Sequence, residues 1–242
     1  MKIRKYILPS LAAILVSVGI AAAAIPGPQR ALAPKLYGLT EIAPNVFTDD
    51  TSRATEWLSM RDVANLKVQN FFGSLKSNPR YILCSTMACE HVFGKQGNIA
   101  QTYGWSFIHV PPKAMQEKDV GLILLTHERV HAELIYRWGV SALWDQKIPN
   151  WFNEGLASFI SEDKRLEPSY SEEQRGWIRG SKTFWDWNGF VVARGWRDAY
   201  GAAEDNVAVI NRKIGHEGLL ALINRSLAGE GFDEVEVQLM RL

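Results

Sequence analysis

The chain has 242 residues, of which 47% are hydrophobic, and its 27 basic residues nearly balance its 26 acidic residues. This composition excludes an intrinsically disordered protein, which combines low hydrophobicity with high net charge. It also gives no indication of nucleic-acid binding, which usually shows a large basic excess. A chain of this length can bury a full core as one domain without support from metals or disulfides.

The first 24 residues predict an export signal. Three basic residues stand near the start of the chain: Lys2, Arg4 and Lys5. An apolar run extends from residue 6 to residue 25 and includes four consecutive alanines that end at Ala24. A basic start, an apolar middle and small residues at the end are typical of a secretory signal peptide, here cleaved near Ala24. An uncleaved signal anchor is the alternative, because about 20 apolar residues are just enough to cross a bilayer.

Export determines which compartment and partners we expect. The protein is expected to be exported, either periplasmic or secreted, or anchored to the membrane by its N-terminal segment. A membrane is a partner only if that segment stays uncleaved. Removal of residues 1–24 takes away three basic residues and leaves a formal charge of −2 in place of +1. A nearly neutral protein gives no electrostatic reason to expect a polyanionic partner, so no nucleic acid is predicted to bind. The sequence leaves the oligomeric state open.

The two cysteines, Cys84 and Cys89, stand close together, with four residues between them. In an oxidising compartment this spacing predicts a short local disulfide bond. Two buried free thiols are the alternative. A zinc site built on cysteines is not expected, because the chain has no second cysteine pair.

The predicted elements begin with strands and end with helices. Residues 25–44 carry four prolines and are predicted to be a linker or lead-in before a single domain over residues 45–242. Apolar periodicity predicts strands over residues 46–48, 81–83 and 103–110, and helices over residues 51–72, 120–138, 151–161, 200–214, 218–228 and 232–242. This layout predicts an α+β fold, with a small N-terminal α/β part and a mostly helical C-terminal half.

The motif H-E-x-x-H stands at residues 127–131, after an apolar run that predicts a half-buried helix. A helix turns about 100° per residue, so His127 and His131 lie about 40° apart around its axis and one turn apart along it. Two imidazoles on one face can hold one metal ion. Glu128 follows the first histidine, where its carboxylate can reach a water molecule rather than the metal itself. A surface helix with two histidines and ordinary ion pairs is the alternative.

A catalytic zinc site needs a third protein ligand and one open position. The sequence W-F-N-E-G-L-A stands downstream at residues 151–157. An H-E-x-x-H helix followed by a W-x-N-E-G-x-A helix resembles the gluzincin clan of zinc metallopeptidases, to which thermolysin and the zinc aminopeptidases belong. The motif match covers about residues 121–160. The resemblance implies a thermolysin-like catalytic domain that binds one zinc ion (Zn2+) per chain. It also implies that Glu154, 23 positions after His131, is the third ligand beside His127 and His131.

The resemblance further implies a substrate class. In this clan an edge strand ahead of the zinc helix pairs with an extended peptide, and the matching segment here is residues 104–110. We therefore expect an exported zinc-dependent peptidase that acts on a peptide or protein. The motif that aminopeptidases carry before the zinc helix is missing, which favours an endopeptidase. Ser158 stands where thermolysin-like members have an acid that supports a histidine ligand, and a hydroxyl orients an imidazole more weakly than a carboxylate.

Two residues are assigned to catalysis. Glu128 is expected to take a proton from the attacking water and to deliver it to the leaving amine. The developing oxyanion needs a further donor, which in this clan is often a Tyr or His from a later helix. Tyr200 is the candidate for this donor, and His216 is the alternative. The other interpretation of Tyr200 is a core residue whose hydroxyl is satisfied by a neighbour.

Other histidines and charges near the motif are interpreted structurally. Glu133 lies one turn from both Arg129 and Arg137, which predicts a ladder of ion pairs in solvent. Support of the metal site is the alternative role for Glu133. His91 and His109 are expected to be structural, because three ligands already complete the metal set.

Two tryptophans stand close together in the sequence, at residues 185 and 187. Trp185 and Trp187 are expected to pack in a core or an interface, and an aromatic wall for a peptide or glycan is the alternative.

A zinc-retaining, non-catalytic peptide-binding protein is the first competing function. Glu128 argues against it, because a binding module has no need of a base at that position. A zinc amidase that acts on cell-wall peptide is the second, with the same ligands and a different substrate.

Overall fold

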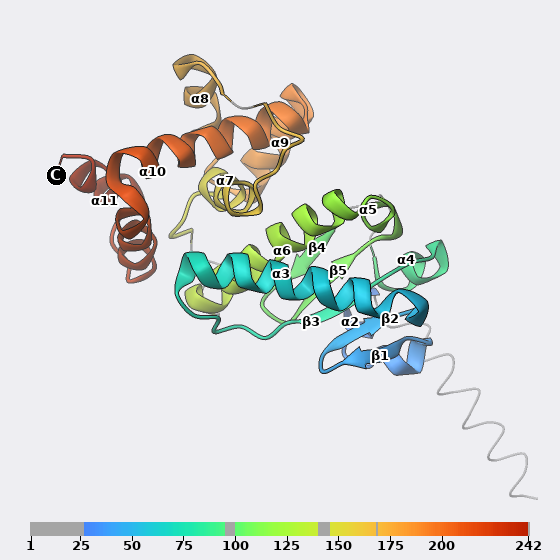
Figure 1. The fold of residues 1–242 in the computed structure, drawn as a ribbon. Coiled ribbons are helices and arrows are strands. Elements are labelled where there is room, and N and C mark those ends of the chain that lie inside the picture. Colours follow the sequence, from blue (N-terminus) through green and yellow to red (C-terminus); the bar gives the residue numbers. More distant parts are fainter. Residues whose placement is uncertain (1–26, 95–99, 140–145, 168, 242) are drawn as a thin grey trace, which may run out of the picture.

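The computed structural model describes residues 27–94, 100–139, 146–167 and 169–241 (Figure 1). The predicted signal peptide, residues 1–24, lies outside them. The fold is α+β, as the sequence predicts, with a five-stranded mixed sheet in the N-terminal part and helices in the C-terminal part. Within the described residues, no helix is both long and apolar enough to cross a membrane.

The sheet has the strand order β1-β2-β3-β5-β4. Its strands are β1 (Thr40–Ala43), β2 (Val46–Thr48), β3 (Arg80–Leu83), β4 (Gln101–Tyr103) and β5 (Phe107–Val110). β2, β3 and β5 run parallel in the centre, and β1 and β4 pair antiparallel at the two edges. All four residues of β5 are buried, because the strand has a neighbour on each side and helices on both faces of the sheet.

The single strand predicted over residues 103–110 is wrong, because the chain reverses in its middle. Gly104 has a φ of 59°, a left-handed conformation that glycine adopts without steric cost. The Ser106 amide donates to the Tyr103 carbonyl oxygen at 3.2 Å and closes the turn. The edge strand implied over residues 104–110 is therefore corrected to β4, and β5 lies inside the sheet.

The linker predicted over residues 25–44 is also corrected, because its described residues are folded against the sheet. They form α2 (Gly27–Arg30), the 3-10 helix η1 (Pro34–Tyr37) and the edge strand β1. Ala31 and Leu39 are buried in the same cluster as the strand residue Phe47. Pro34 stands at the start of η1 and Pro44 lies in the turn between β1 and β2, so the domain begins before residue 45.

Helices cover both faces of the sheet (Figure 1). One face carries α3 (Ala54–Phe72), which follows the 3-10 helix η2 (Thr51–Arg53), and α6 (Lys118–Trp138), which follows α5 (Pro112–Gln116). Trp57 of α3 and Leu125 of α6 pack there against Ile108 of β5. The other face carries α2 and α4 (Met87–Phe93), where Phe93 packs against Ile82 of β3.

The predicted disulfide bond between Cys84 and Cys89 is confirmed. It joins the end of β3 to α4, on the face of the sheet that α2 covers. Thr86 caps α4, because its hydroxyl oxygen accepts a hydrogen bond from the Cys89 amide at 3.3 Å. The bond therefore holds a short helix to the strand that precedes it.

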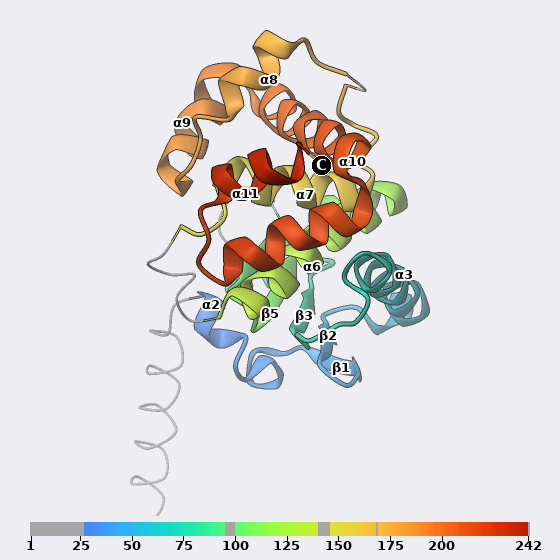
Figure 2. The same cartoon turned by 90° about the vertical axis from the view of Figure 1, so that its left-hand side faces the viewer.

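The C-terminal half consists of helices in its described residues. They are α7 (Asn150–Ser161), α8 (Glu172–Ile178), α9 (Phe184–Arg194), α10 (Trp196–Leu227) and α11 (Phe232–Leu239). Gly215, with a φ of 70°, breaks α10 at the position where the sequence predicts a separation. α7 lies between α6 and α10 and thereby connects the two halves (Figures 1 and 2).

Close contact between α7 and α10 depends on Gly155. A Cβ at this position would overlap the carbonyl oxygen of Ala203 and press on Val207. The two helices therefore approach backbone to backbone directly beside Glu154. This contact also places the start of α10, which carries Tyr200, next to the glutamate.

Candidate metal site between α6 and α7

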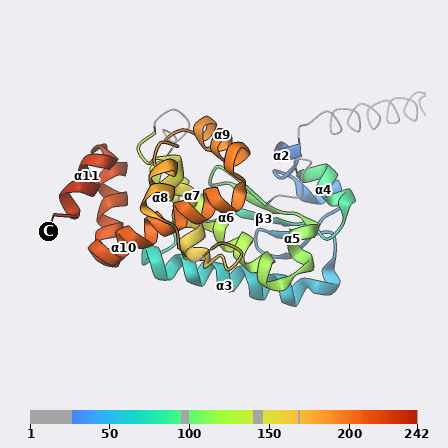
Figure 3. The same ribbon diagram turned by 90° about the horizontal axis from the view of Figure 1, so that it is seen from above.

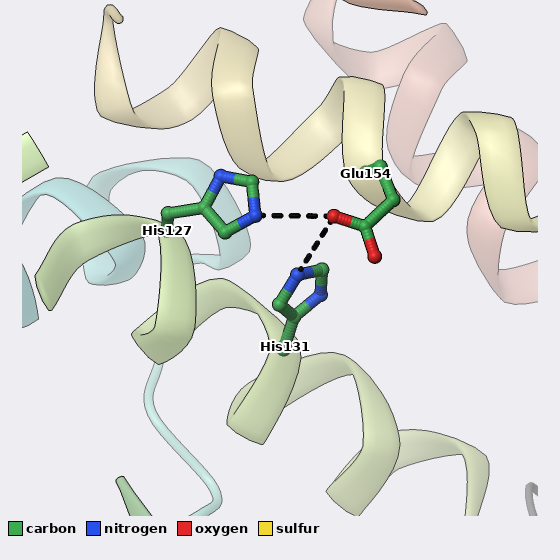
Figure 4. Close-up of side chains that lie close together, drawn as sticks. All are labelled: His127, His131 and Glu154. Carbon is green, nitrogen blue, oxygen red and sulfur yellow. Dashed lines mark hydrogen bonds and ion pairs between the residues drawn. The ribbon is translucent and has the colours of Figure 1, made fainter. Parts of the chain in front are cut away.

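Two helices bring three potential metal ligands together. His127 and His131 lie one turn apart on α6, and Glu154 points to them from α7 (Figure 4). Glu154 Oε2 lies 3.2 Å from His127 Nε2 and 3.3 Å from His131 Nε2. The ligand atoms of all three residues lie within 4.8 Å of one another. The predicted ligand set therefore converges at one point between the helices.

Two of the three separations between these atoms match those around a tetrahedral ion. Donor atoms about 2.0–2.1 Å from a tetrahedral zinc ion are separated from one another by about 3.3 Å. The two separations that involve Glu154, 3.2 and 3.3 Å, agree with that value. Two imidazole nitrogens and one carboxylate oxygen are also a donor set that zinc accepts in hydrolytic enzymes. The three residues thus form a group that can hold a metal ion.

Each of these three side chains affects the protonation of the others. Burial disfavours a charged imidazole, but the negative charge of Glu154 and its hydrogen bond outweigh burial and raise the pKa of His131 to about 9. Burial also disfavours ionised Glu154, and the charges and hydrogen bonds of the two histidines outweigh it, which holds the pKa of Glu154 well below its ordinary value. Without a metal, the site is therefore held together as an internal ion pair.

Asn153 orients one of the two histidines. Its side-chain oxygen lies 3.0 Å from Nδ1 of His131, on the opposite side of the ring from Glu154. An amide oxygen only accepts hydrogen bonds, so this contact keeps a proton on Nδ1 and leaves Nε2 as the nitrogen that can give up its proton to bind a metal. Nε2 is the atom that faces Glu154, and a lone pair there is what a metal requires.

Glu128 lies beside the ligands and is bound by the edge strand. Its side chain is buried, with 7% of the residue exposed. The Thr102 hydroxyl of β4 lies 2.8 Å from Glu128 Oε2 and 2.7 Å from the Glu128 carbonyl oxygen, and its single proton serves either of them. Thr102 reaches α6 because it pairs with Ile108, whose side chain faces the same side of the sheet.

Tyr200, and not His216, lies at the site. The Tyr200 ring centre is 5.8 Å from that of His127 and 4.9 Å from that of Trp187. Burial and the charge of Glu154 raise the pKa of Tyr200 well above its ordinary value, so its hydroxyl keeps its proton. His216 is exposed and packs against Phe71, on the part of α10 beyond the break.

Ser158 does not support a histidine in the way the equivalent acid would. Its hydroxyl oxygen is buried and has no hydrogen-bond partner among the described residues. Its carbonyl oxygen accepts a hydrogen bond from the Ser161 hydroxyl at 3.0 Å. The support that the resemblance places at this position is therefore not provided by Ser158 itself.

Glu133 is buried. The predicted ion pairs are present, but the prediction that they lie in solvent is wrong. The ion pairs exist, with Glu133 oxygens 3.4 Å from Arg129 and 2.9 Å from Arg137. However, the Glu133 side chain is 0% exposed and accepts further hydrogen bonds from the Lys76 and Ser77 amides at 2.9 and 3.0 Å. These contacts connect α6 to the loop before β3 and lie apart from the three donors.

The two remaining histidines lie outside the donor group. His91 is exposed on α4. His109 is buried on β5, and its Nε2 lies 3.0 Å from Glu90 Oε2 on the face of the sheet that α4 covers. Both positions agree with the structural role that the sequence predicts for these residues.

Three residues of the site were not assigned from the sequence. Thr102 contacts Glu128, Asn153 contacts His131, and Trp187 packs against Tyr200. A signal exists only for Asn153, which is part of the W-x-N-E-G-x-A pattern and lies next to a ligand. Thr102 and Trp187 come from elements whose placement against α6 and α10 is a property of the tertiary structure.

Comparisons with protein-family models, with curated proteins and with solved structures found no match. The motif and the geometry of the residues around it are therefore the features from which function is inferred.

Proposed function

We propose that the protein is an exported zinc-dependent peptidase of the gluzincin type, with endopeptidase activity favoured. The observation that carries the proposal is the convergence of His127, His131 and Glu154, whose ligand atoms lie within 4.8 Å of one another, with Glu154 Oε2 3.2 and 3.3 Å from the two imidazole nitrogens. A buried carboxylate, Glu128, stands directly beside these donors. Hydrolysis needs both a metal ligand set and a base within reach of the same water molecule.

Different residues of the chain have different roles in the proposed reaction. Zinc, when bound, would supply a Lewis acid that lowers the pKa of water to about 7. Thr102 holds Oε2 of Glu128, so we assign proton transfer to Oε1 of that carboxylate. Glu128 takes the proton of the attacking water and returns it to the leaving amine nitrogen. Tyr200 keeps its proton and donates a hydrogen bond to the carbonyl oxygen as negative charge develops there.

An extended peptide is the substrate that the surroundings favour. β4 is an edge strand, so one of its two sides offers backbone donors and acceptors that are not used within the sheet. A peptide that pairs with this edge lies beside Glu128, because Thr102 of β4 contacts the same carboxylate. Backbone pairing holds a substrate without selecting its side chains, which is what an endopeptidase requires.

Export agrees with the state of the cysteines. The N-terminal segment has the composition of a secretory signal, and the disulfide between Cys84 and Cys89 is of a kind that persists in oxidising compartments. We therefore place the activity in the periplasm or outside the cell.

Glu128→Gln is the variant that tests the activity. The purified protein is expected to hold about one zinc ion per chain by elemental analysis. It is then incubated with a peptide library, with and without a chelator, and the products are identified by mass spectrometry. Glu128→Gln should keep the zinc but lower the rate of cleavage about 10²–10⁴-fold, because only the base is lost. Glu117→Gln, an exposed glutamate at the start of the same helix, is the matched control.

The outcomes separate the competing functions. Cleavage of cell-wall peptides with no cleavage of the library would indicate the amidase. Zinc binding with equal inertness of wild type and Glu128→Gln on both substrate classes would indicate a binding protein. Absence of zinc from a correctly folded wild type would remove the basis of the proposal.

A further inference from the structure

α9 has one buried residue, and this residue packs against Tyr200. Trp187 is 3% exposed, whereas Trp185, two positions earlier, is 80% exposed. The expectation that both tryptophans pack in a core is therefore correct for Trp187 and wrong for Trp185. The rings of Trp187 and Tyr200 meet edge to face, with their centres 4.9 Å apart and their planes at 82°. The buried side chain of α9 thus lies on the tyrosine to which we assign stabilisation of the oxyanion.

The two ends of α9 fix the position of Trp187. Thr183 caps the helix, because its hydroxyl oxygen accepts a hydrogen bond from the Asp186 amide at 3.1 Å, and Asp186 Oδ2 accepts one from the Thr183 amide at 2.9 Å. At the other end a single residue, Gly195, joins α9 to α10 with a φ of 88°, a conformation that favours glycine. α9 therefore lies against the first turns of α10, at the end of α10 that is far from α11 (Figures 1 and 3). This corner brings Trp187 and Tyr200 together from two different helices.

A hydrogen bond joins the side chains of Trp187 and Tyr200. An indole N–H can only donate, so the Tyr200 hydroxyl oxygen is the acceptor of this bond. The proton of the hydroxyl is not used in the contact with Trp187 and points to another acceptor. A hydroxyl that accepts a hydrogen bond is also a stronger donor, because successive hydrogen bonds polarise one another. These are the properties that a donor to an oxyanion needs.

The surroundings of Tyr200 make the direction of its proton important. The negative charges of Glu154 and Glu128 both act on the hydroxyl, and the ring centre of His127 lies 5.8 Å from that of Tyr200. A hydroxyl rotates about its C–O bond unless a partner holds it. A freely rotating Tyr200 hydroxyl would donate to a carboxylate of the site as well as to a substrate. The bond from Trp187 restricts this rotation, because it occupies one side of the oxygen.

We infer that Trp187 is a positioning residue for the reaction: its indole N–H holds the Tyr200 hydroxyl oxygen, so that the hydroxyl proton points to the carbonyl oxygen of the substrate. The inference rests on the proposed function, because it concerns the same site. Trp187 acts through Tyr200 and not on the reacting atoms. α9 thereby contributes to catalysis although it carries none of the three metal ligands.

The indole N–H resonance of Trp187 tests the hydrogen bond in the absence of substrate. The purified protein is isotope-labelled, and the resonance is assigned in the nuclear magnetic resonance spectrum. In Tyr200→Phe the acceptor is missing, so the resonance should move upfield and its hydrogen should exchange with water at least about fivefold faster. Tyr136→Phe is the matched control, because this exposed tyrosine packs against Trp105 and should leave the Trp187 resonance unchanged.

Trp187→Phe tests the catalytic role, because phenylalanine keeps an aromatic ring but has no N–H. We expect kcat on a cleaved peptide to fall about tenfold, with little change in KM or in zinc affinity. In a protein that already carries Tyr200→Phe, the same substitution should cause no further loss, because no hydroxyl is left to orient. Trp185→Phe, on the same helix, is the matched control and should leave kcat unchanged in both backgrounds. Circular dichroism establishes that the variants are folded.

An identical Trp187 resonance in wild type and Tyr200→Phe would overturn the inference. An equal loss of kcat from Trp187→Phe with and without the Tyr200 hydroxyl would also overturn it, because Trp187 would then serve packing alone. A wild type that cleaves no peptide would instead count against the proposed function. The resonance would then decide by itself whether Trp187 holds the Tyr200 hydroxyl, as it would if Trp187→Phe failed to fold, so the two failures are distinguishable.

Discussion

Asn153 and Glu154, neighbours on α7, hold the two nitrogens of one imidazole on α6. The Asn153 oxygen lies 3.0 Å from Nδ1 of His131, and Glu154 Oε2 lies 3.3 Å from its Nε2. The orientation of the ring is therefore fixed by two adjacent residues of a single helix. Any movement of α7 relative to α6 would disturb both contacts together.

Asn153→Leu is expected to weaken zinc binding about 10–100-fold, because His131 loses the acceptor that keeps its lone pair on Nε2. The affinity is measured by competition with a chromogenic chelator. Asn150→Leu is the matched control, since this residue begins the same helix and its side-chain nitrogen has no partner among the described residues. Equal zinc affinity in both variants would contradict an orienting role for Asn153.

Thr102→Val is expected to lower kcat on a cleaved peptide about tenfold and to change KM little, because the hydroxyl holds Glu128 and not the substrate. Valine has nearly the shape of threonine, so the edge strand keeps its packing. Thr102→Ser restores a hydroxyl at the same position and should recover most of the lost rate. A loss confined to KM, or a failure of serine to recover kcat, would argue that Thr102 acts only through the strand.

Gly155→Ala is expected to destabilise the protein by about 1–3 kcal/mol, because the added methyl group overlaps the Ala203 carbonyl oxygen and forces α7 away from α10. Thermal denaturation followed by circular dichroism measures the change. Gly176→Ala is the matched control, because a Cβ there meets no atom within 4 Å and alanine favours the helix α8 by about 0.5–1 kcal/mol. We expect opposite signs for the two substitutions, and an unchanged melting temperature for Gly155→Ala would contradict the close contact.

Glu133→Gln is expected to cost about 3 kcal/mol at pH 7, since Arg129 would remain buried without its counter-charge. Burial disfavours the ionised carboxyl, but hydrogen bonds from the Ser77 and Lys76 amides and the charge of Arg129 outweigh it and lower the pKa of Glu133. A carboxyl with a lowered pKa in the folded state stabilises the protein above its unfolded pKa of about 4.3. That contribution is lost as the pH falls through the folded pKa.

The difference between wild type and Glu133→Gln should therefore be constant from neutral pH down to about pH 5 and should shrink below it. Urea denaturation at a series of pH values measures it. Glu230→Gln, which removes an exposed partner of Arg225, should destabilise the protein much less than Glu133→Gln does at pH 7, because solvent screens an exposed ion pair. A difference for Glu133→Gln that does not change with pH would mean that ionisation of this carboxyl is not the source of its contribution.

Several features of the fold follow from patterns that are local in the sequence. The helix that carries His127 and His131 and the break at Gly215 depend on spacing and on backbone preferences of neighbouring residues. The disulfide between Cys84 and Cys89 is local as well, because so short a loop brings the thiols together. The strand over residues 103–110 was predicted wrongly, because alternation of side chains continues through a turn when the turn residues happen to fit the pattern.

By itself, the sequence determined that two side chains can bind one metal, since helical periodicity sets the relation of His127 to His131, whereas Glu154 was implied only by the resemblance of the W-x-N-E-G-x-A pattern to the gluzincin clan. Only the tertiary structure decided that β4 is the edge strand, that Thr102 holds Glu128, and that Glu133 is buried. The reason is physical. Contacts within a helix are fixed by a repeat of a few residues. Contacts between elements depend on how whole faces pack. At Gly155, for example, the absence of a side chain allows α7 and α10 to approach closely, and this contact sets the position of the site.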